Sequence, residues 1–459
     1  MEYREEHDSL GIIKVPKMAL WGAQTERSRH NFAVGPVMPE LVVRALINIK
    51  KAAARVNKQL GQLDERRALL IEQACDQILA MPEMMSSFPL KVYQTGSGTQ
   101  SNMNVNEVIS HVAHELDPHL LIHPNDHVNM AQSSNDTFPT AMQIAAFQET
   151  KRVLTVLEKV DQTLKGKQEE FWQVVKIGRT HLQDAVPMTF GQEISGWRAA
   201  LNHSRQALQA NLILLAELPI GGTAIGTGLN VPEGFDQAMV AELGKIYRLN
   251  LVCAPNKFQG LANHTGINII HGIFKSLASD LVKIGNDIRF LASGPRAGYE
   301  ELVIPANEPG SSIMPGKVNP TQIEALTMAA ATVMGNDTTI TFAASQGNFE
   351  MNVYKPVIIQ AFLASADLLA GVTASFEEHC LRGLTVNQQR MHELVDNSLM
   401  LVTALSPHIG YEKSAEIALT AQRQQLTLRQ AALQSGYLTA DEYDQWIKPL
   451  AMTNSQSTD

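Results

Sequence analysis

Apolar residues recur at intervals of three and four positions over most of this chain, which is the pattern of amphipathic helices. The stretch from His264 to Ser293 shows it plainly, with Ile267, Ile270 and Phe274 on one face. The same periodicity predicts helices over Leu41–Leu60, Arg66–Met81, Thr140 to about Trp172, Gln192–Leu218, Thr321–Ala344 and Val353–Phe376. At about 1.5 Å per residue, a helix of ~30 residues spans ~45 Å, which exceeds most globular domains.

Several of these helices are apolar on more than one face. The helix expected over Thr321–Ala344 carries charge only at Glu324 and Asp337. A helix that is apolar most of the way round is buried on all sides. One monomeric bundle buries few such helices, so we expect an oligomer whose helices pack into a shared core.

Helical patterns dominate and no clear series of strands appears, so the expected fold class is all-α. Pro139 suits the first turn of the long helix that follows it. The chain before this helix is more broken by loops, and shorter helices follow the long ones. We therefore place domains at residues 1–132, 133–388 and 389–459.

Composition narrows the class of protein. The chain has 459 residues, of which 44% are hydrophobic, enough for a large core, and a net charge of −9. No basic block appears, which argues against nucleic acid as a partner. No run of apolar residues is long enough for a membrane span. Cys75, Cys253 and Cys380 form no CxxC pair, so reduced thiols in a cytoplasmic protein are the favoured interpretation.

The segment Pro309-Gly-Ser-Ser-Ile-Met-Pro-Gly-Lys-Val-Asn-Pro320 is the most informative in the sequence. It fails the P-loop pattern, because five residues separate Gly310 from Gly316 and Val318 follows the lysine. Apolar residues make a plain solvated linker a poor fit. A loop that closes over a small anion is the favoured interpretation, and an ordinary surface loop is the alternative.

Three further polar clusters lie at loops or helix starts. Thr95-Gly-Ser-Gly-Thr-Gln-Ser-Asn102 and Gln132-Ser-Ser-Asn-Asp-Thr137 each precede or open a helix, so each is either a helix cap or an anion site at the positive end of a helix. Gly178-Arg-Thr-His-Leu-Gln-Asp184 places His181 among polar side chains, where an imidazole can act as an acid or base. Glu324 follows the loop above by one helical turn, and a carboxylate beside an imidazole fixes its tautomer.

A metal site is not favoured. His123-Pro-Asn-Asp-His127 offers two histidines in a loop, which is an incomplete ligand set, and no HExxH pattern occurs.

These motifs together resemble the signature of the fumarase/aspartase superfamily, and within it the chain is most similar to class II fumarases. The resemblance rests on Gly310–Pro320 and extends over nearly the whole chain, through the stretches Leu20–Arg27, Thr95–Asn104, Ser133–Thr140, Thr180–Met188 and Ala344–Glu350. Gly316 is typical of fumarases, where aspartases tend to have alanine.

The resemblance implies an all-α, three-domain subunit and a homotetramer with a helical-bundle core. It implies reversible hydration of fumarate to (S)-malate, a reaction of the tricarboxylic acid cycle, with no metal or organic cofactor. Small dicarboxylates would be the partners, and each active site would draw on three subunits.

The resemblance also assigns roles in the site. Ser311 would be the base that removes the C3 proton of malate, and His181, paired with Glu324, would handle the proton of the leaving hydroxyl. The two carboxylates would be held by Ser97, Thr99, Ser133, Ser134, Asn135, Thr180, Ser312, Lys317 and Asn319.

A second dicarboxylate site would lie at His123, Asn125 and Asp126. Leu120 stands where some relatives carry an arginine, and His127 replaces a usual aspartate.

Just before the catalytic loop, Gly298-Tyr-Glu-Glu301 replaces a more glycine-rich Gly-Ile-Gly-Glu. Glu300 lacks the backbone freedom of glycine, so loop closure is expected to differ from that of relatives.

Two other functions compete with this one. Aspartate ammonia-lyase or another lyase of the superfamily would use the same stabilised intermediate, but Gly316 and the Leu-Trp-Gly-Ala-Gln-Thr motif argue against it. An inactive scaffold is the second, and the intact set of acid–base residues argues against that.

Overall fold

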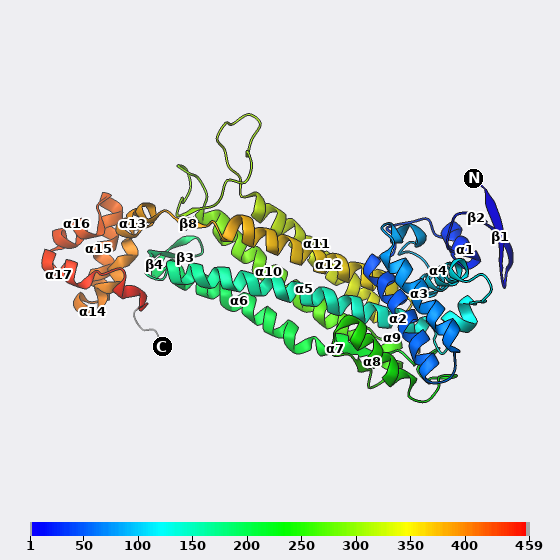
Figure 1. The fold of residues 1–459 in the computed structure, drawn as a ribbon. Helices are drawn as coiled ribbons and strands as arrows, with labels where there is room; N and C mark the ends of the chain where they lie inside the picture. Colours follow the sequence, from blue (N-terminus) through cyan, green and yellow to red (C-terminus); the bar gives the residue numbers. More distant parts are fainter. Residues whose placement is uncertain (1, 456–459) are drawn as a thin grey trace. The chain divides into compact units, whose positions relative to one another are not determined.

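The computed structural model describes residues 2–455, and helices dominate it (Figure 1). The chain divides into two compact units. Unit 1 is the chain up to Leu154 together with Gln206–Ser276 and Ala331–Leu369. Unit 2 consists of Thr155–Arg205, Leu277–Ala330 and the chain from Ala370 onward.

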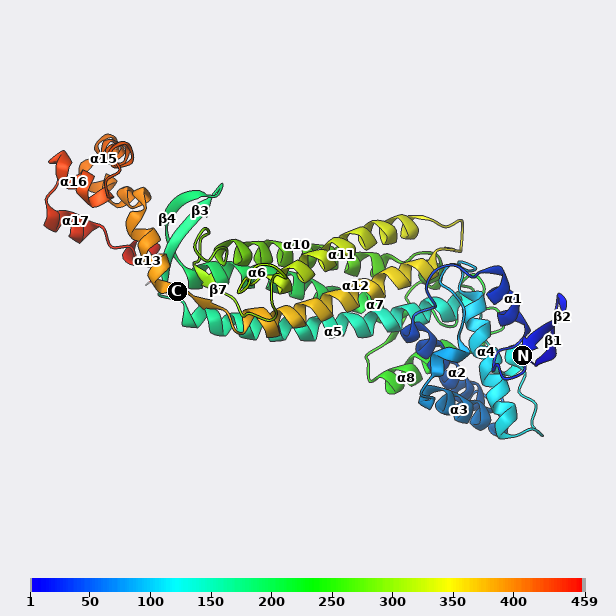
Figure 2. The same ribbon diagram turned by 90° about the horizontal axis from the view of Figure 1, so that it is seen from above.

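Long helices supply segments to both units and run side by side within each (Figures 1 and 2). They are α5 (Ser134–Glu170), α6 (Phe190–Asn211), α10 (Thr265–Leu291), α11 (Thr321–Ser345) and α12 (Lys355–Phe376). The helices expected from the apolar periodicity are confirmed, with ends that differ by a few residues. The stretch predicted as one helix over Gln192–Leu218 is α6 followed by the short helix α7 (Ile213–Ala216).

Helix α5 begins six residues earlier than predicted, so Pro139 lies inside it and not in its first turn. The early start has a local cause. The Ser133 N–H donates to Asp136 Oδ1 at 2.9 Å, and the Thr137 N–H donates to the Ser133 carbonyl at 3.0 Å. These bonds close the first turn ahead of the proline.

Unit 1 adds shorter elements around its segments of the long helices. Helix α2 packs against α3, α4 and α8 through a nearly continuous apolar face. The shorter elements are β1 (Tyr3–Asp8), β2 (Gly11–Pro16), α1 (Ala23–Asn31), α2 (Glu40–Gln59), α3 (Glu65–Ala80), a 3-10 turn (Met84–Ser87), α4 (Thr99–Leu116), a π-turn (Pro124–Val128), α7, β5 (Glu217–Leu218), α8 (Phe235–Tyr247), β6 (Val252–Cys253) and α9 (Lys257–Ala262).

Unit 2 adds a hairpin and a group of small C-terminal helices. Its shorter elements are β3 (Val175–Thr180), β4 (Gln183–Thr189), β7 (Leu302–Val303), a π-turn (Glu377–Leu381), β8 (Thr385–Val386), α13 (Gln388–Asn397), a 3-10 turn (Leu399–Ala404), α14 (Ser406–Ile409), α15 (Tyr411–Gln424), α16 (Leu428–Ser435), α17 (Ala440–Trp446) and a 3-10 turn (Ala451–Thr453).

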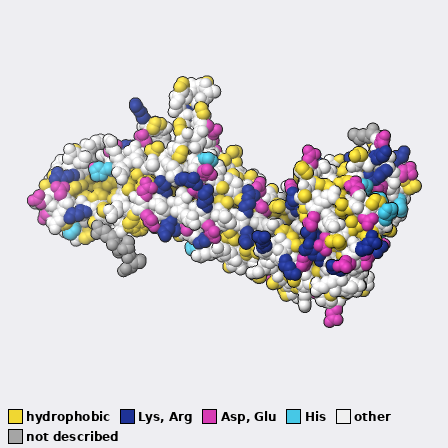
Figure 3. Space-filling view, viewed as in Figure 1, with side chains coloured by type: hydrophobic (Ala, Val, Ile, Leu, Met, Phe, Trp, Pro, Cys, Tyr) yellow, Lys and Arg dark blue, Asp and Glu magenta, His cyan; other side chains and the backbone are white. Residues whose placement is uncertain are grey.

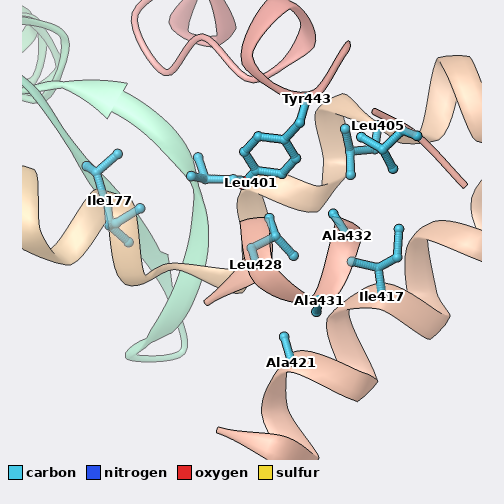
Figure 4. Close-up of a cluster of buried hydrophobic side chains, with 11 residues drawn as sticks. Ile177, Leu401, Leu405, Ile417, Ala421, Leu428, Ala431, Ala432 and Tyr443 are labelled. Atoms are coloured by element: carbon cyan, nitrogen blue, oxygen red, sulfur yellow. The ribbon is translucent and has the colours of Figure 1, made fainter. Parts of the chain in front are cut away.

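A buried apolar cluster joins the hairpin to the C-terminal helices (Figure 4). Ile177 on β3 belongs to the same cluster as Leu401, Leu428 and Tyr443, and its side chain is 1% exposed. The base of the hairpin is therefore fixed in a hydrophobic core.

The expectation of an all-α fold is confirmed. Within residues 2–455 the strands pair only two by two, as β1 with β2, β3 with β4, β5 with β6, and β7 with β8. Such short strands leave too little period-two alternation to be seen in the sequence. The three-domain division follows chain order, unlike the two units, and stays a prediction.

One stretch of the described residues, Lys355–Leu381, is long and apolar enough to meet the composition of a membrane span. However, 56% of its apolar window is buried inside the chain, as expected of a core helix. On the face shown in Figure 3, Lys and Arg are interspersed with Asp and Glu and do not gather into one patch.

Candidate active site

Two helix N-termini meet in unit 1 and bring five of the predicted site residues together. The hydroxyls of Ser97 and Thr99 lie 2.8 Å apart, and the Thr99 hydroxyl lies 2.8 Å from that of Ser134. Ser133 Oγ accepts the N–H of Asn135 at 3.2 Å. Because α4 begins at Thr99 and α5 at Ser134, both positive helix ends face the same polar group of side chains, which favours a bound carboxylate.

Two glycines make this approach of the chain segments sterically allowed. A Cβ on Gly96 would lie 1.4 Å from the carbonyl oxygen of Val353, and one on Gly98 would lie 2.3 Å from the ring of Phe138. Gly98 also has a φ of +80°, a conformation that side chains disfavour. Only glycine fits at either position, so the Gly-Ser-Gly spacing is a packing requirement of this site.

Asp136 fixes the start of α5 from within the core. Its carboxylate accepts the N–H groups of Ser133, Gly221 and Thr223 at 2.9 to 3.0 Å. Burial raises the pKa of Asp136 to about 6, although these three hydrogen bonds act in the opposite direction. The cluster predicted as either a helix cap or an anion site therefore contains a cap, and its other polar groups remain for a ligand.

Lys50 is a buried cation under the same segment, and its role was not predicted. It lies on α2 with a fully buried side chain, and its Nζ donates to Asn129 Oδ1 and Gln132 Oε1, both at 2.9 Å. Burial lowers the pKa of Lys50 to about 7. The sequence held a signal for it, since Lys50 falls on the apolar face of a predicted helix, one turn after Leu46.

A second buried lysine lies next to the Gly96 loop. Lys355 begins α12, its backbone N–H donates to the Gly96 carbonyl at 3.2 Å, and its side chain is fully buried. Burial lowers the pKa of Lys355 to about 8, and the charge of Asp136 acts in the opposite direction.

In unit 2 the hairpin of β3 and β4 presents His181 at its tip. His181 and Leu182 have φ values of +55° and +60°, and both side chains are exposed. A break in strand register occurs at Gly178, where a Cβ would lie 2.8 Å from the Val186 carbonyl. Bulges of this kind re-aim the side chains that follow, here Thr180 and His181.

The loop between β7 and α11 closes on itself through its own backbone. The Gly310 N–H donates to the Lys317 carbonyl at 2.8 Å, and Asn319 Nδ2 donates to the Gly310 carbonyl at 2.7 Å. Lys317 Nζ donates to Asn319 Oδ1 at 2.7 Å. The structure therefore brings the two predicted carboxylate-binding groups Lys317 and Asn319 into contact, on a loop that stands out from the helices in Figure 1.

The hydroxyl of Ser311 lies close to two backbone N–H groups of the same loop. Its Oγ accepts the N–H of Ile313 at 3.2 Å and that of Met314 at 3.0 Å. Two N–H donors aimed at a hydroxyl oxygen stabilise its ionised form. Ser312 is exposed beside it.

His181 and Glu324, predicted as a pair, are not brought together within one chain. Among residues 2–455, no hydrogen bond or ion pair joins them, and both side chains are exposed. Glu324 lies in the first turn of α11, where its backbone N–H donates to the Pro320 carbonyl.

The residues of the predicted second site form one π-turn in unit 1. His123 Nδ1 accepts the N–H of Asp126 at 3.2 Å, and His127 Nδ1 accepts the N–H of His123 at 2.8 Å. His123 thus caps the turn, and His127, inside the turn, bonds back to the backbone of the cap residue. His123 and Asn125 line a cavity of about 730 Å³.

Arg4 lines the same cavity, but its guanidinium is engaged elsewhere. It donates to the carbonyls of Ala19 and Trp21, both at 2.7 Å, so it holds the β1–β2 hairpin in place. No group of three or more His, Cys, Asp or Glu side chains within the described chain has the spacing of a metal site.

Comparison with known proteins gives a consistent result over the whole chain. Residues 11–335 match the lyase family model, and residues 401–454 match the model of the fumarase C C-terminus. The chain is 56% identical over 453 residues to a protein of Listeria monocytogenes named fumarate hydratase class II, covering 98% of this chain and 99% of that one. A protein of the same name from Haemophilus ducreyi is 52% identical over 463 residues, covering 99% and 100%.

A solved structure agrees with this. The crystal structure of class II fumarase from Schistosoma mansoni superposes with a TM-score of 0.95 at 44% identity, covering 98% of this chain and 99% of that one. The chain therefore belongs to the family of class II fumarate hydratases, within the lyase superfamily.

Proposed function

We propose that this chain is a fumarate hydratase, which interconverts fumarate and (S)-malate. The observation that carries the proposal is the environment of Ser311, whose Oγ accepts two backbone N–H groups in a loop that also carries Lys317 and Asn319. Full-length identity above 50% to proteins named for this activity supports it.

Ser311 acts as the base in the direction from malate to fumarate. Its ionised oxygen takes the proton from C3, and the electrons of the broken C–H bond move into the neighbouring carboxylate to give an aci-carboxylate. The Ile313 and Met314 N–H groups make this possible, because they stabilise the ionised serine before the proton is taken.

The intermediate carries extra negative charge, which fixed donors must stabilise. Lys317 supplies a cation, and Asn319 and Ser312 supply hydrogen bonds. The carboxylates are held further by Thr180 and by the group at the two helix N-termini in unit 1, which consists of Ser97, Thr99, Ser133, Ser134 and Asn135.

The second half of the reaction removes the hydroxyl from C2. His181 delivers a proton through a water molecule as the C–O bond breaks, so that water leaves and fumarate remains. Glu324 orients and stabilises the imidazolium that forms in the reverse direction. These steps use acid–base groups and fixed charges only, with no metal or organic cofactor.

The chain works as a homotetramer in which three subunits build each site. One support is a strip of exposed residues on α11 that follow each other at three- and four-residue spacing and are uncharged after Glu324: Ala325, Met328, Ala331, Thr332, Gly335, Thr338 and Phe342. We call this set the α11 stripe. Further copies of the chain are the occupants that the stripe fits, because it continues a helical bundle.

A second support is the separation of His181 and Glu324 within one chain. Both are exposed, so each is available to a neighbouring subunit. The setting proposed for this enzyme is the cytoplasm and the tricarboxylic acid cycle, and His123, Asn125 and Asp126 form its second dicarboxylate site.

The assay is the ultraviolet absorbance of fumarate, followed with purified protein, (S)-malate and EDTA. The proposal expects absorbance to rise. No rise with malate, together with consumption of fumarate when ammonia is added, would replace hydration by an ammonia-lyase activity.

A further inference from the structure

The segment Tyr299–Glu301 contacts the hairpin that carries His181 at the side chain of Arg179. The guanidinium of Arg179 forms an ion pair with the carboxylate of Glu301, which is fully buried. The ring of Tyr299 covers the same guanidinium, with 4.7 Å between Arg179 Cζ and the ring centroid. Arg179 immediately precedes Thr180 and His181, so both groups act close to the tip of the hairpin.

The segment Tyr299–Glu301, which contacts Arg179, is hydrogen-bonded both to the end of α10 and to the start of α13. On one side, the Tyr299 N–H donates to Ser293 Oγ at 3.1 Å and the Glu301 N–H donates to the Leu291 carbonyl at 2.8 Å. These two acceptors belong to the end of α10 and the turn after it. The backbone at Tyr299–Glu301 is therefore not a free loop.

On the other side, the segment is bonded to the start of α13. Arg390 Nε donates to the Tyr299 carbonyl at 3.1 Å, and the Asn387 N–H donates to the Glu301 carbonyl at 2.9 Å. Glu300, between them, has a φ of +55° and donates its N–H to the Ser293 carbonyl at 2.9 Å. Because Glu300 adopts a left-handed conformation, the chain turns there, and the side chains of Tyr299 and Glu301 can both reach Arg179.

Within residues 2–455, no other ion pair or ring contact holds the hairpin near its tip. Its base is held by Ile177 in the C-terminal core (Figure 4), but the tip at His181 and Leu182 is exposed. Arg179, His181 and Tyr299 line one cavity of about 820 Å³. The stacked pair therefore lies beside the space that the imidazole faces.

We propose that Tyr299 is a positioning residue for His181, acting through the stacked and ion-paired guanidinium of Arg179. This inference rests on the proposed function, since His181 is the acid–base group of that reaction. A planar guanidinium held on its face by a ring and on its edge by a carboxylate has little freedom to rotate. The imidazole at the hairpin tip therefore keeps its orientation, because Arg179, two residues before it, is restrained.

The first experiment compares kcat and KM for malate in three variants. Tyr299→Ile removes the ring, and we expect kcat to fall by ~10-fold or more, with a much smaller change in KM, because misaimed acid–base groups slow the reacting step. Tyr299→Phe keeps the stacked ring and is expected to restore kcat. Tyr411→Ile removes the same kind of ring at a position on α15 that is 81% exposed, and it is expected to leave kcat unchanged.

The second experiment tests whether Tyr299 acts through Arg179. Arg179→Lys loses the planar group that the ring covers. In a double-mutant cycle, adding Tyr299→Ile to Arg179→Lys should lower kcat no further. Losses that multiply would overturn the proposal, since they would show that Tyr299 acts independently of Arg179.

The third experiment needs no activity, so it separates this inference from the proposed function. Hydrogen–deuterium exchange read by mass spectrometry should be faster in peptides covering Val175–Thr189 of Tyr299→Ile than of Tyr299→Phe, with peptides of α15 unchanged. If exchange is faster in Tyr299→Ile but the protein does not hydrate fumarate, the proposed function is wrong. The restraint of the hairpin by Tyr299 is then still supported. Equal exchange in the two variants, or normal kcat in Tyr299→Ile, would overturn the inference.

Discussion

The ammonium of Lys50 lies 2.9 Å from Gln132 Oε1, one residue before Ser133. The same ammonium also donates to Asn129 Oδ1, which accepts the side-chain N–H groups of Asn102 and Asn106 as well. The Lys50 ammonium therefore donates hydrogen bonds to the oxygens of two neutral amide side chains. These bonds fix the chain between the π-turn that ends at Val128 and the start of α5.

Lys50→Met should weaken substrate binding. Loss of the ammonium leaves the oxygens of Asn129 and Gln132 without their charged donor, and the chain before Ser133 shifts. We expect KM for malate to rise by ~10-fold, or about 1.4 kcal/mol, and the free energy of unfolding to fall by ~1–3 kcal/mol. Steady-state kinetics and denaturant unfolding measure both quantities. Lys58→Met, an exposed lysine on the same helix, is the control, and equal KM values in the two variants would contradict the account.

His264 makes stability depend on acid pH. Burial, with the nearby charge of Lys355, lowers the pKa of His264 from 6.5 to about 3. The unfolded chain then binds a proton below pH 6.5 that the folded chain does not, so stability is present above this pH and is lost as pH falls towards 3.

The expected slope from this one group is about 1.4 kcal/mol per pH unit. Denaturant unfolding of wild type and His264→Gln at several pH values, at one protein concentration, measures it. The variant should lose stability less steeply between pH 6.5 and the folded pKa. Parallel curves for the two proteins would show that His264 does not carry the effect.

Lys317→Ala should abolish most turnover, because the cation that faces the developing charge is removed. Loss of one such group costs ~10²–10³-fold in kcat. The control is Lys165→Ala, an exposed lysine on α5. Turnover of Lys317→Ala within a few-fold of the control would remove Lys317 from the proposed mechanism.

Charge placed in the α11 stripe should break the assembly. Met328 is 67% exposed in the single chain, and Met328→Glu would bury a carboxylate in a helical core, at a cost of several kcal/mol. Analytical ultracentrifugation should show smaller species, with activity lost in parallel. Gln422→Glu on α15 adds the same charge elsewhere. A tetramer in the Met328 variant would mean that the stripe is not an interface.

Much of this arrangement was visible in the sequence, because it depends on neighbours along the chain. Helices follow from apolar periodicity, and the contact of Lys317 with Asn319 follows from two residues of separation in one turn. From the residues alone, Ser97, Thr99 and Ser134 were predicted as parts of two separate polar clusters, and only the family resemblance placed them in one site. Periodicity cannot show that two helix starts lie side by side.

Contacts between distant segments were the ones that sequence did not reveal. Arg179 and Glu301 are 122 positions apart, and Lys50 and Gln132 are 82 apart. Nothing local distinguishes a buried ion pair from two surface charges. Glu300 is a partial exception, since it stands where relatives have glycine and has a φ of +55°, a conformation that glycine adopts more readily. The expected difference in loop closure stays a prediction.

Ser311 is, in the proposed mechanism, the base of a hydratase. The most direct test is fumarate formation from (S)-malate in EDTA by wild type and Ser311→Ala, each first shown to have the same assembly. We expect rapid fumarate formation by wild type and a loss of ~10³-fold or more in the variant, because a general base contributes ~10²–10⁴-fold. No fumarate from wild type, or near-normal turnover by Ser311→Ala, would contradict it.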